Sequence, residues 1–249
     1  MKTQPSSHGL KMIPRHVAVI MDGNGRWARK RMLNRIEGHR RGIESVRAVV
    51  RTAGELGIEH LTLYAFSKEN WKRPKTEIAA LMHLLGRFLR QEIGELNDNN
   101  VRLRAIGVLD DLPPRVLRQF RETEAATAKN TGLTLVLALS YGARDEIARA
   151  ARRIAIGVAA GRIDPASVDE ESIARHLDTA GIPDPDLLIR TSGELRVSNF
   201  LLWQISYSEF VASPVLWPDF RREQFLDALR EFGDRHRRFG GVDPMPKKT

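Results

Sequence analysis

A short apolar run that ends in an acidic residue and a glycine turn constrains this chain more than any other stretch. Residues 17–21 read Val-Ala-Val-Ile-Met, and Asp22-Gly23-Asn24-Gly25 follows directly. A continuous apolar run with β-branched members predicts a strand buried on both faces, as in the middle of a parallel sheet. The glycines let backbone N–H groups approach a ligand, and a helix that begins there points its positive end at the same place. The stretch therefore predicts an anion-binding turn after a central strand.

The turn also fits a loose dinucleotide fingerprint, Gly-x-Gly-x-x-Ala over residues 23–28. Against that reading, Asp22 would repel a pyrophosphate unless a cation lay between them. The next strand, near 59–66, carries no acidic residue at its end to hold a ribose hydroxyl. An Asp, two glycines and Arg26 suit a diphosphate bound with Mg²⁺, because a hard cation takes carboxylate and phosphate oxygens together. An ordinary glycine turn capped by Asp22 remains the alternative.

The length of 249 residues favours one α/β domain with a large core. We expect a loose lead-in over 1–15, a catalytic domain over 16–240 and a basic tail over 241–249. No run approaches the roughly 18 apolar residues of a membrane span, and the first residues lack the apolar segment of a signal peptide. The chain has no cysteine, which excludes disulfides and thiol nucleophiles. The expected location is the cytoplasm, with contact to a membrane surface left open.

The charge balance favours an anionic partner. Lys and Arg number 40 against 31 Asp and Glu, a formal net charge of +9. Phosphate esters, acidic lipid and nucleic acid all fit such a balance. The sequence has no zinc-finger spacing, RNP-like aromatic motif or basic region followed by heptads. Nucleic acid is therefore not an expected partner, and a nucleic-acid-binding protein stays only as an alternative.

A second polar stretch follows the next predicted strand, residues 61–66. It reads Ser67-Lys68-Glu69-Asn70-Trp71-Lys72-Arg73-Pro74. Ligands of open α/β sheets bind outside the carboxyl ends of strands, so this loop and the Asp22 turn should face one crevice. The alternative is a surface loop with Trp71 packed beneath it.

The helices between these stretches carry weaker signals. Residues 29–31 are basic and are interpreted as a solvated face, whereas Arg35 and His39 can fold back and add donors to a bound diphosphate. Apolar spacing predicts a helix over 43–56 and a longer one from Pro74 through residue 93. Leu84 and Phe88 widen the apolar stripe of the longer helix, which favours an apolar cavity beside it over plain core.

The C-terminal half predicts strands over 101–108 and 133–140 and a helix over 143–156. A strand-like run over 186–190 ends in Arg190, and a glycine-containing loop then offers Arg196 and Ser198. Two guanidinium groups and a hydroxyl suit a second diphosphate. Glu209 lies in an otherwise apolar segment, so its carboxylate needs a salt bridge or a metal ion as partner.

Five segments together resemble the cis-prenyltransferase (Z-type isoprenyl diphosphate synthase) family, whose best-known members make undecaprenyl diphosphate. In the family's order they are residues 16–28, Gly38-His39-x-x-Gly42, 66–74, 189–200 and 217–220. The resemblance implies a single α/β domain with a central, mostly parallel sheet flanked by helices and an apolar product tunnel. It also implies a homodimer. The implied activity is the Mg²⁺-dependent condensation of isopentenyl diphosphate with an allylic diphosphate, such as farnesyl or geranyl diphosphate, to a Z-polyprenyl diphosphate.

The resemblance also implies roles for individual residues. Asp22 would hold Mg²⁺ and assist departure of the allylic diphosphate, and Glu209 would complete the metal site across the dimer interface. Asn70 is a catalytic candidate that we interpret as a positioning group, because a neutral amide is a poor base. The allylic diphosphate would be bound by Gly23, Asn24, Gly25, Arg26, Arg35 and His39. The reacting ends would be placed by Ser67, Asn70, Trp71 and Arg73, and isopentenyl diphosphate would be bound by Arg190, Arg196 and Ser198. Trp27, Lys68, Glu69 and Val197 complete the expected substrate-binding set.

Other functions stay open from sequence alone. An irregular prenyl-condensing or terpene synthase on the same fold is the nearest alternative, and a non-catalytic partner subunit would also use a basic surface. Departures from the family pattern, such as Met32-Leu33-Asn34 where a Gly-Leu-Pro-like turn is common and Leu195 at a position that is polar in some members, bear on loop geometry. Product length and preferred starter are not predicted.

Overall fold

The computed structural model describes residues 9–235, and its centre is one sheet of six parallel strands. The expected lead-in is described only from residue 9, and the expected basic tail over 241–249 lies outside the described residues. The strand order across the sheet is β3-β4-β2-β1-β5-β6. The strands are β1 (His16–Ile20), β2 (His60–Ser67), β3 (Arg102–Ile106), β4 (Thr134–Tyr141), β5 (Leu187–Arg190) and β6 (Glu209–Ala212). The predicted parallel α/β sheet is confirmed.

The strand order reverses beside β1. From β1 the chain crosses to β2 on one side, and after β4 it returns to place β5 on the other side of β1. In open parallel sheets such a switch point leaves a crevice outside the carboxyl ends of the two strands, because the connections leave them in opposite directions. The residues that follow β1 and end β5 therefore lie at the position where this architecture binds ligands.

Eight α-helices and four short 3₁₀ segments connect and cover the strands within the described residues. The α-helices are α1 (Asn24–Lys30), α2 (Arg35–Glu55), α3 (Lys75–Gln91), α4 (Ile93–Asp98), α5 (Pro114–Thr127), α6 (Ala143–Ala159), α7 (Glu170–Ala174) and α8 (Arg222–Asp234). The 3₁₀ segments are η1 (Lys68–Lys72), η2 (Leu109–Asp111), η3 (Pro165–Ser167) and η4 (Trp217–Asp219). None of the described helices is long and apolar enough to cross a membrane.

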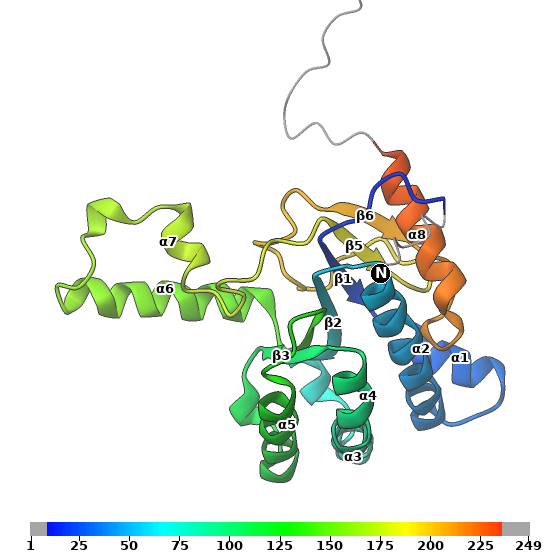
Figure 1. Ribbon diagram of the computed structural model, residues 1–249. Helices are drawn as coiled ribbons and strands as arrows, with labels where there is room; N and C mark the ends of the chain where they lie inside the picture. Colours follow the sequence, from blue (N-terminus) through cyan, green and yellow to red (C-terminus); the bar gives the residue numbers. More distant parts are fainter. Residues whose placement is uncertain (1–8, 236–249) are drawn as a thin grey trace, which may run out of the picture.

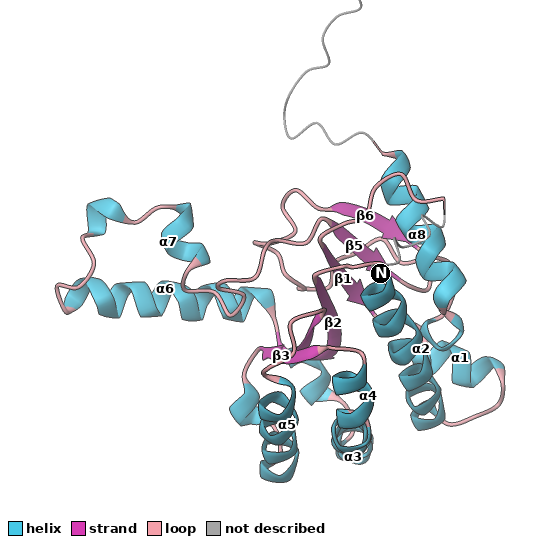
Figure 2. Ribbon diagram, in the orientation of Figure 1, coloured by secondary structure: helices cyan, strands magenta, loops and turns pink. Residues whose placement is uncertain are grey.

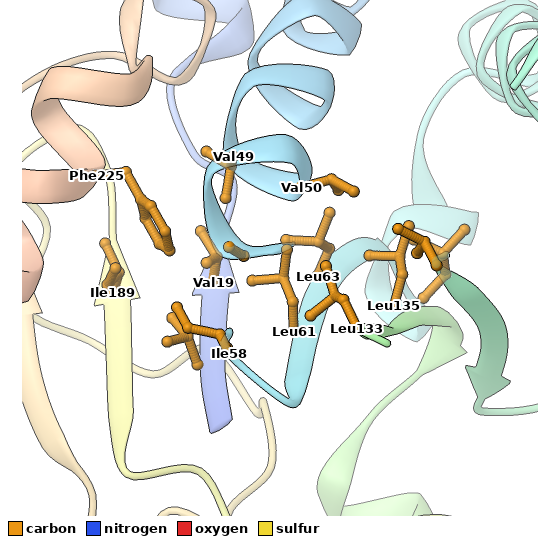
Figure 3. Packing of buried hydrophobic residues seen from close by; sticks show 14 of the residues in the cluster. Val19, Val49, Val50, Ile58, Leu61, Leu63, Leu133, Leu135, Ile189 and Phe225 are labelled. Carbon is orange, nitrogen blue, oxygen red and sulfur yellow. The ribbon is translucent and has the colours of Figure 1, made fainter. Parts of the chain in front are cut away.

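Alternate residues of the central strands feed two cores, because successive side chains of a strand point to opposite faces. Val19 and Leu63 pack with Val49 of α2 on the face that α2, α3, α5 and α8 cover. Figure 3 shows Val49, Val19 and Ile189 meeting Phe225 of α8 on this face. Every residue of β1 is buried, which confirms the prediction of a strand covered on both faces.

The second face of the sheet has a smaller cover. Ala18 and Ala138 pack there with Phe200 and Leu201, which belong to the loop segment between β5 and β6. Figure 1 shows α6 and α7 reaching away from the sheet, whereas α2, α3, α5 and α8 supply buried side chains to the first core. The site described below lies on the face that α2 and α3 cover and at the carboxyl ends of β1, β2 and β5.

The observed helix bounds differ from the predicted ones in two places. α2 begins at Arg35 instead of 43, and the Asn34 side chain accepts a hydrogen bond from the Glu37 N–H at 2.9 Å as its N-terminal cap. The predicted helix from Pro74 through 93 is two helices. They meet at Glu92, whose buried carboxylate accepts from Arg47 Nε of α2 at 3.0 Å.

Candidate active site

Asp22 and Arg190 meet across the switch point. Asp22 follows β1, Arg190 ends β5, and the two strands pair in register at Ile20 and Arg190. Arg190 Nη2 donates to Asp22 Oδ2 at 2.8 Å, and the Arg190 side chain is only 4% exposed. Arg26 lies on the other side of the carboxylate, with its Nη2 at 3.1 Å from the same oxygen. The acidic residue is thus held between two guanidinium groups.

This arrangement keeps Asp22 ionised. Burial acts to raise the pKa of Asp22, but the hydrogen bonds and positive charges of Arg190 and Arg26 outweigh it and hold the pKa below its ordinary value. The other carboxylate oxygen accepts from the Gly23 N–H at 2.6 Å. Asp22 therefore presents a fixed negative charge at the edge of the sheet.

The glycines around Asp22 are required by close packing. Gly23 has a φ of +106°, a left-handed conformation that side chains rarely adopt. On α2, a Cβ at Gly38 would lie 2.1 Å from the Asn24 carbonyl oxygen, and one at Gly42 would lie 2.6 Å from Asn24 Oδ1. These two glycines let α2 pack directly against the first turn of α1. They explain the physical role of the Gly38-x-x-x-Gly42 pattern.

A polar cavity of about 150 Å³ opens beside this turn. Its lining joins residues from the Asp22 turn, α1, α2 and the end of η1. They are Met21, Asp22, Gly23, Asn24, Gly25, Arg26, Arg29, Arg35, His39 and Arg73. All six residues predicted to bind the allylic diphosphate are thereby brought together with Asp22 and Arg73. Arg29, interpreted from sequence as solvated, is an additional lining residue that a basic run alone does not distinguish.

Glu77 of α3 holds two of the cationic side chains in the polar cavity. Its carboxylate lies 3.3 Å from Arg35 Nη1 and 3.1 Å from Arg73 Nη1. His39 stays neutral beside them, because burial and then the charge of Arg73 lower its pKa to about 4. The cavity thus presents fixed guanidinium groups and a neutral imidazole.

An apolar cavity of about 190 Å³ adjoins the polar one. Both cavities share Met21, Asn24, His39 and Arg73 in their walls. The apolar cavity continues between β2, β4, α2 and α3, and Leu84 and Phe88 line it as the wide stripe predicted. The arrangement suits one molecule with an anionic head and an apolar tail.

The segment after β2 is a 3₁₀ turn at the rim of the apolar cavity. The Ser67 N–H donates to Asn70 Oδ1 at 3.2 Å, which fixes the Asn70 amide at the cavity wall. Trp71 packs edge-on against Phe66 and donates from Nε1 to Ser140 Oγ at 2.8 Å. Asn70 and Arg73 line the cavity, whereas Trp71 supports the segment from beneath.

Nine predicted substrate-binding residues lie outside the linings of both cavities, and Trp27, Lys68, Glu69 and Val197 are four of them. Lys68 pairs with Asp145 of α6 at 2.5 Å, and Glu69 accepts from Asn199 Nδ2 at 2.9 Å. Trp27 is buried and donates from Nε1 to Asp219 Oδ1 at 2.7 Å, and Val197 packs on the second core. Their contacts hold the site's loops together, and direct substrate binding by them stays a prediction.

Arg190, Arg196 and Ser198 are close together beside Asp22. Arg190 Nη1 donates to Ser198 Oγ at 2.7 Å and to the Arg196 carbonyl oxygen. The Arg190 Nε is buried with no hydrogen-bond partner among the described residues. The Arg196 side chain is 62% exposed, and its guanidinium pairs with Glu194.

Glu194 is a residue of the site that the sequence interpretation missed. Its two carboxylate oxygens pair with Arg26 at 2.9 Å and with Arg196, and Ser192 Oγ accepts from Arg26 Nη2 at 2.5 Å. Glu194 therefore ties the α1 side of the site to the Arg196 loop. Its position between two arginines in the folded chain is invisible in the sequence, where it is one acid in a polar loop.

Glu209 does not meet Asp22 within one chain. It begins β6 and pairs in register with Leu187, at the amino end of the sheet, whereas Asp22 lies beyond the carboxyl end. Its carboxylate forms a 3.0 Å ion pair with Arg235, the salt bridge that was the alternative to a metal. Among the described residues no three His, Cys, Asp or Glu side chains gather as a metal site. A shared metal site of Asp22 and Glu209 would need a second subunit.

The fold and this geometry suit an enzyme whose ligands have an anionic head and an apolar tail, because the cationic cavity and the apolar one share a wall. The family profile described as "Putative undecaprenyl diphosphate synthase" matches residues 20–240. An isoprenyl transferase of Rhizobium meliloti is 56% identical over 92% of this chain and 93% of its own length. An isoprenyl transferase of Chlorobaculum tepidum is 53% identical over 95% of this chain and 89% of its own length.

Two solved structures have the same fold. Lavandulyl diphosphate synthase from Lavandula x intermedia, in complex with dimethylallyl diphosphate, superposes with a TM-score of 0.89 at 39% identity, covering 91% of this chain and 98% of that one. A probable undecaprenyl diphosphate synthase from Campylobacter jejuni gives a TM-score of 0.76 at 38% identity, covering 92% and 99%. The protein is a cis-prenyltransferase. It belongs to the undecaprenyl diphosphate synthase family of isoprenyl transferases, as its sequence motifs predicted.

Proposed function

We propose that this enzyme condenses isopentenyl diphosphate with an allylic diphosphate, such as farnesyl or geranyl diphosphate, to a longer Z-polyprenyl diphosphate. The observation that carries the proposal is the shared wall between the polar cavity and the apolar cavity, with a separate Arg190 and Arg196 group on the other side of Asp22. One diphosphate with an apolar tail fits the two joined cavities. A second diphosphate with a short tail fits the arginine group, because guanidinium binds phosphate oxygens in pairs.

The reaction follows from the charges at these two positions. The allylic C–O bond breaks, and its electron pair leaves with the diphosphate into the cavity lined by Arg35 and Arg73. The double bond of isopentenyl diphosphate forms the new C–C bond to the cationic allylic carbon, and one proton is then lost to a diphosphate oxygen. Fixed positive charges at the leaving group stabilise the transition state without reorganising, which is worth several kcal/mol in such sites. The apolar cavity excludes water from the cationic carbon, and Asn70 positions the reacting ends at its rim.

The residues fit a magnesium ion that arrives with the diphosphate. Asp22 is an ionised carboxylate at the polar cavity, and Mg²⁺ is commonly held by one or two carboxylates together with substrate phosphates. When bound, the ion supplies further charge neutralisation at the leaving group. Asp22 would hold it in this chain, and Glu209 of a partner subunit would be the second carboxylate.

The proposal includes a homodimer that works in the cytoplasm. A second subunit supports it chemically, because Glu209 cannot reach Asp22 of its own chain. The oligomeric state follows from sedimentation equilibrium, where the proposal expects twice the chain mass of 28.1 kDa.

The experiment that tests the proposal is an activity assay in which the purified protein is incubated with Mg²⁺, farnesyl diphosphate and ¹⁴C-labelled isopentenyl diphosphate. We expect label in a butanol-extractable product longer than the starter, with newly formed Z double bonds. The matched control is the Arg190→Lys variant, which keeps the charge but loses the paired geometry of guanidinium. Inactivity of the folded wild-type enzyme with C10, C15 and C20 starters would refute the proposal.

Irregular condensation is a second candidate because of one observation. The lavandulyl diphosphate synthase structure superposes with a higher TM-score than the Campylobacter jejuni structure at nearly equal identity. The same labelled reaction separates the two functions: regular condensation gives a linear chain that grows by five carbons, whereas irregular condensation gives a branched product of two allylic units without isopentenyl label.

A further inference from the structure

The turn between α1 and α2 exposes apolar side chains that no described element covers. Met32 is 97% exposed, Leu33 is 44% exposed and Ile36, in the first turn of α2, is 38% exposed. No other stretch of five described residues exposes three large apolar side chains. Figure 1 and Figure 2 show this turn as a loop at the outer edge of the molecule. Such a patch usually marks a binding surface.

The backbone of the turn holds Met32 outward. Met32 has a φ of +55°, a left-handed conformation that favours glycine at the end of a helix. The Met32 N–H donates to the Arg29 carbonyl at 3.1 Å, and the Leu33 N–H donates to the Ala28 carbonyl at 2.9 Å. In this motif the residue after the left-handed one usually packs back on the helix, but Leu33 stays partly exposed. The turn is therefore a fixed projection with an apolar tip.

The charges around the tip are almost all positive. Between residues 29 and 41 there are six Lys or Arg side chains and one acid, Glu37, which pairs with Arg40 at 2.9 Å through Arg40 Nε. Arg31 lies over the Trp27 ring and pairs with Asp219 at 3.3 Å, and Arg35 pairs with Glu77 at 3.3 Å, so both charges are partly neutralised. Arg29, Lys30 and Arg41 are exposed. An apolar tip among exposed basic side chains matches an anionic lipid bilayer, which takes apolar side chains into its interface and attracts Lys and Arg.

We propose that the Met32-Leu33 turn docks this enzyme on an anionic lipid bilayer. This inference rests on the proposed function in one respect, since an apolar product of a prenyl-condensing enzyme has to reach a membrane. Arg29 and Arg35 line the polar cavity and flank the same turn, so docking places that cavity next to the lipid surface. The membrane contact then belongs to the rim where the diphosphates bind.

The absence of cysteine from the chain permits a site-specific test. A Met32→Cys variant labelled with an environment-sensitive fluorophore is titrated with vesicles of phosphatidylcholine and phosphatidylglycerol at 7:3, and with vesicles of phosphatidylcholine alone. We expect a blue shift only on the anionic vesicles, and its reversal by high salt. An Ile156→Cys variant, at an exposed apolar position on α6, is the matched control and should show no shift.

Co-sedimentation with the same vesicles measures the contribution of the apolar tip. The Met32→Ser/Leu33→Ser double variant should lose at least about tenfold in partitioning, Lys30→Glu several-fold, and Ile156→Ser none. Turnover in detergent solution should stay at the wild-type level in all three, so a failure of docking is distinguishable from a failure of the proposed reaction. Wild-type partitioning by the double variant, an equal loss with Ile156→Ser, or a shift of the Met32→Cys label that follows protein concentration without lipid would overturn the proposal.

Discussion

Arg190 Nη2 lies 2.8 Å from Asp22 Oδ2, and this contact joins the ends of two neighbouring strands at the switch point of the sheet. The Arg190 guanidinium keeps Asp22 ionised and also belongs to the proposed second diphosphate site. The two proposed diphosphates are therefore coupled through one ion pair. Substitutions on either side of it should be separable by kinetics.

Replacement of Asp22 by Ala should lower kcat by about 10²–10³-fold, because a fixed charge at the leaving group is lost. The fold should persist, since Asp22 is only partly buried and its neighbours Arg26 and Arg190 keep other hydrogen bonds. Steady-state kinetics and far-UV circular dichroism on the same preparations measure both. Near-normal turnover in the Asp22→Ala protein would remove this residue from the mechanism.

Two arginine variants should affect different substrates. Arg35→Ala removes a lining residue of the polar cavity and should raise the KM for the allylic diphosphate. Arg196→Ala removes an exposed guanidinium of the loop that contacts Arg190 and should raise the KM for isopentenyl diphosphate. Because each variant loses one charged contact to a diphosphate, we expect each KM to rise about tenfold or more. The assignment of the two sites fails if both variants change the same KM.

The glycines of α2 offer a matched pair of substitutions. Gly38→Ala should lower kcat by about 100-fold, because the new methyl group overlaps the Asn24 carbonyl at 2.1 Å and moves α2 or the Asp22 turn. Gly54→Ala lies on the same helix, and its added methyl group meets nothing within 4 Å. The control should keep full activity and gain roughly 0.5–1 kcal/mol in the free energy of unfolding. Equal kinetic effects of the two substitutions would contradict the packing explanation.

Phe88 should limit the length of the product. It lines the apolar cavity, and with Val46 it also borders a cavity of about 20 Å³ on its far side. Phe88→Ala should join the two cavities and lengthen the product by one or more five-carbon units. Thin-layer analysis of the dephosphorylated product measures the shift. Phe120 is buried on α5 and lines neither cavity, so Phe120→Ala is the control. A truncation of this kind lowers the free energy of unfolding by about 3–5 kcal/mol wherever it is made in the core. An unchanged product from a folded Phe88→Ala enzyme would contradict this role.

The stability of the protein should fall between pH 6.5 and about 4. Burial lowers the pKa of His16 to about 4, so the unfolded chain takes up a proton in this range and the folded chain does not. Above pH 6.5 His16 is neutral in both the folded and the unfolded chain, and the free energy of unfolding is at its full value. The shift of His16 lowers this free energy by about 3 kcal/mol as the pH falls to 4. Urea unfolding of wild type, His16→Asn and the exposed control His83→Asn measures it. His39 has the same shift, so the slope in His16→Asn should be reduced and not abolished. A slope in His16→Asn as steep as that of the wild type would contradict the assignment.

The sequence predicted the parts of the fold that local patterns determine. The buried β1 strand, the helix that starts after Pro74 and the wide apolar stripe with Leu84 and Phe88 each carry a continuous or periodic signal. The start of α2 was predicted too late, because Arg35, Arg40 and Arg41 hide the helix period, although Asn34 and Glu37 have the spacing of a cap. β6 was not anticipated, since a short edge strand of four residues leaves little periodicity.

The sequence predicted those residues of the site that belong to a recognisable motif. The turn around Asp22 and the partners Arg35, His39 and Arg73 meet in one cavity as expected. Arg29 and Glu194 were missed because their roles depend on tertiary contacts between distant segments. Glu209 shows the same limit: its sequence position favours a partner, but the fold shows that Arg235 fills that role within one chain.

The most direct measurement is a crystal structure with isopentenyl diphosphate and farnesyl thiodiphosphate, an unreactive analogue of the allylic substrate. We expect the thiodiphosphate against Arg35 and Arg73 with its tail between α2 and α3, and isopentenyl diphosphate against Arg190 and Arg196. Asp22 should lie between the two headgroups. A thiodiphosphate bound elsewhere, or an empty apolar cavity beside an occupied polar one, would contradict this arrangement.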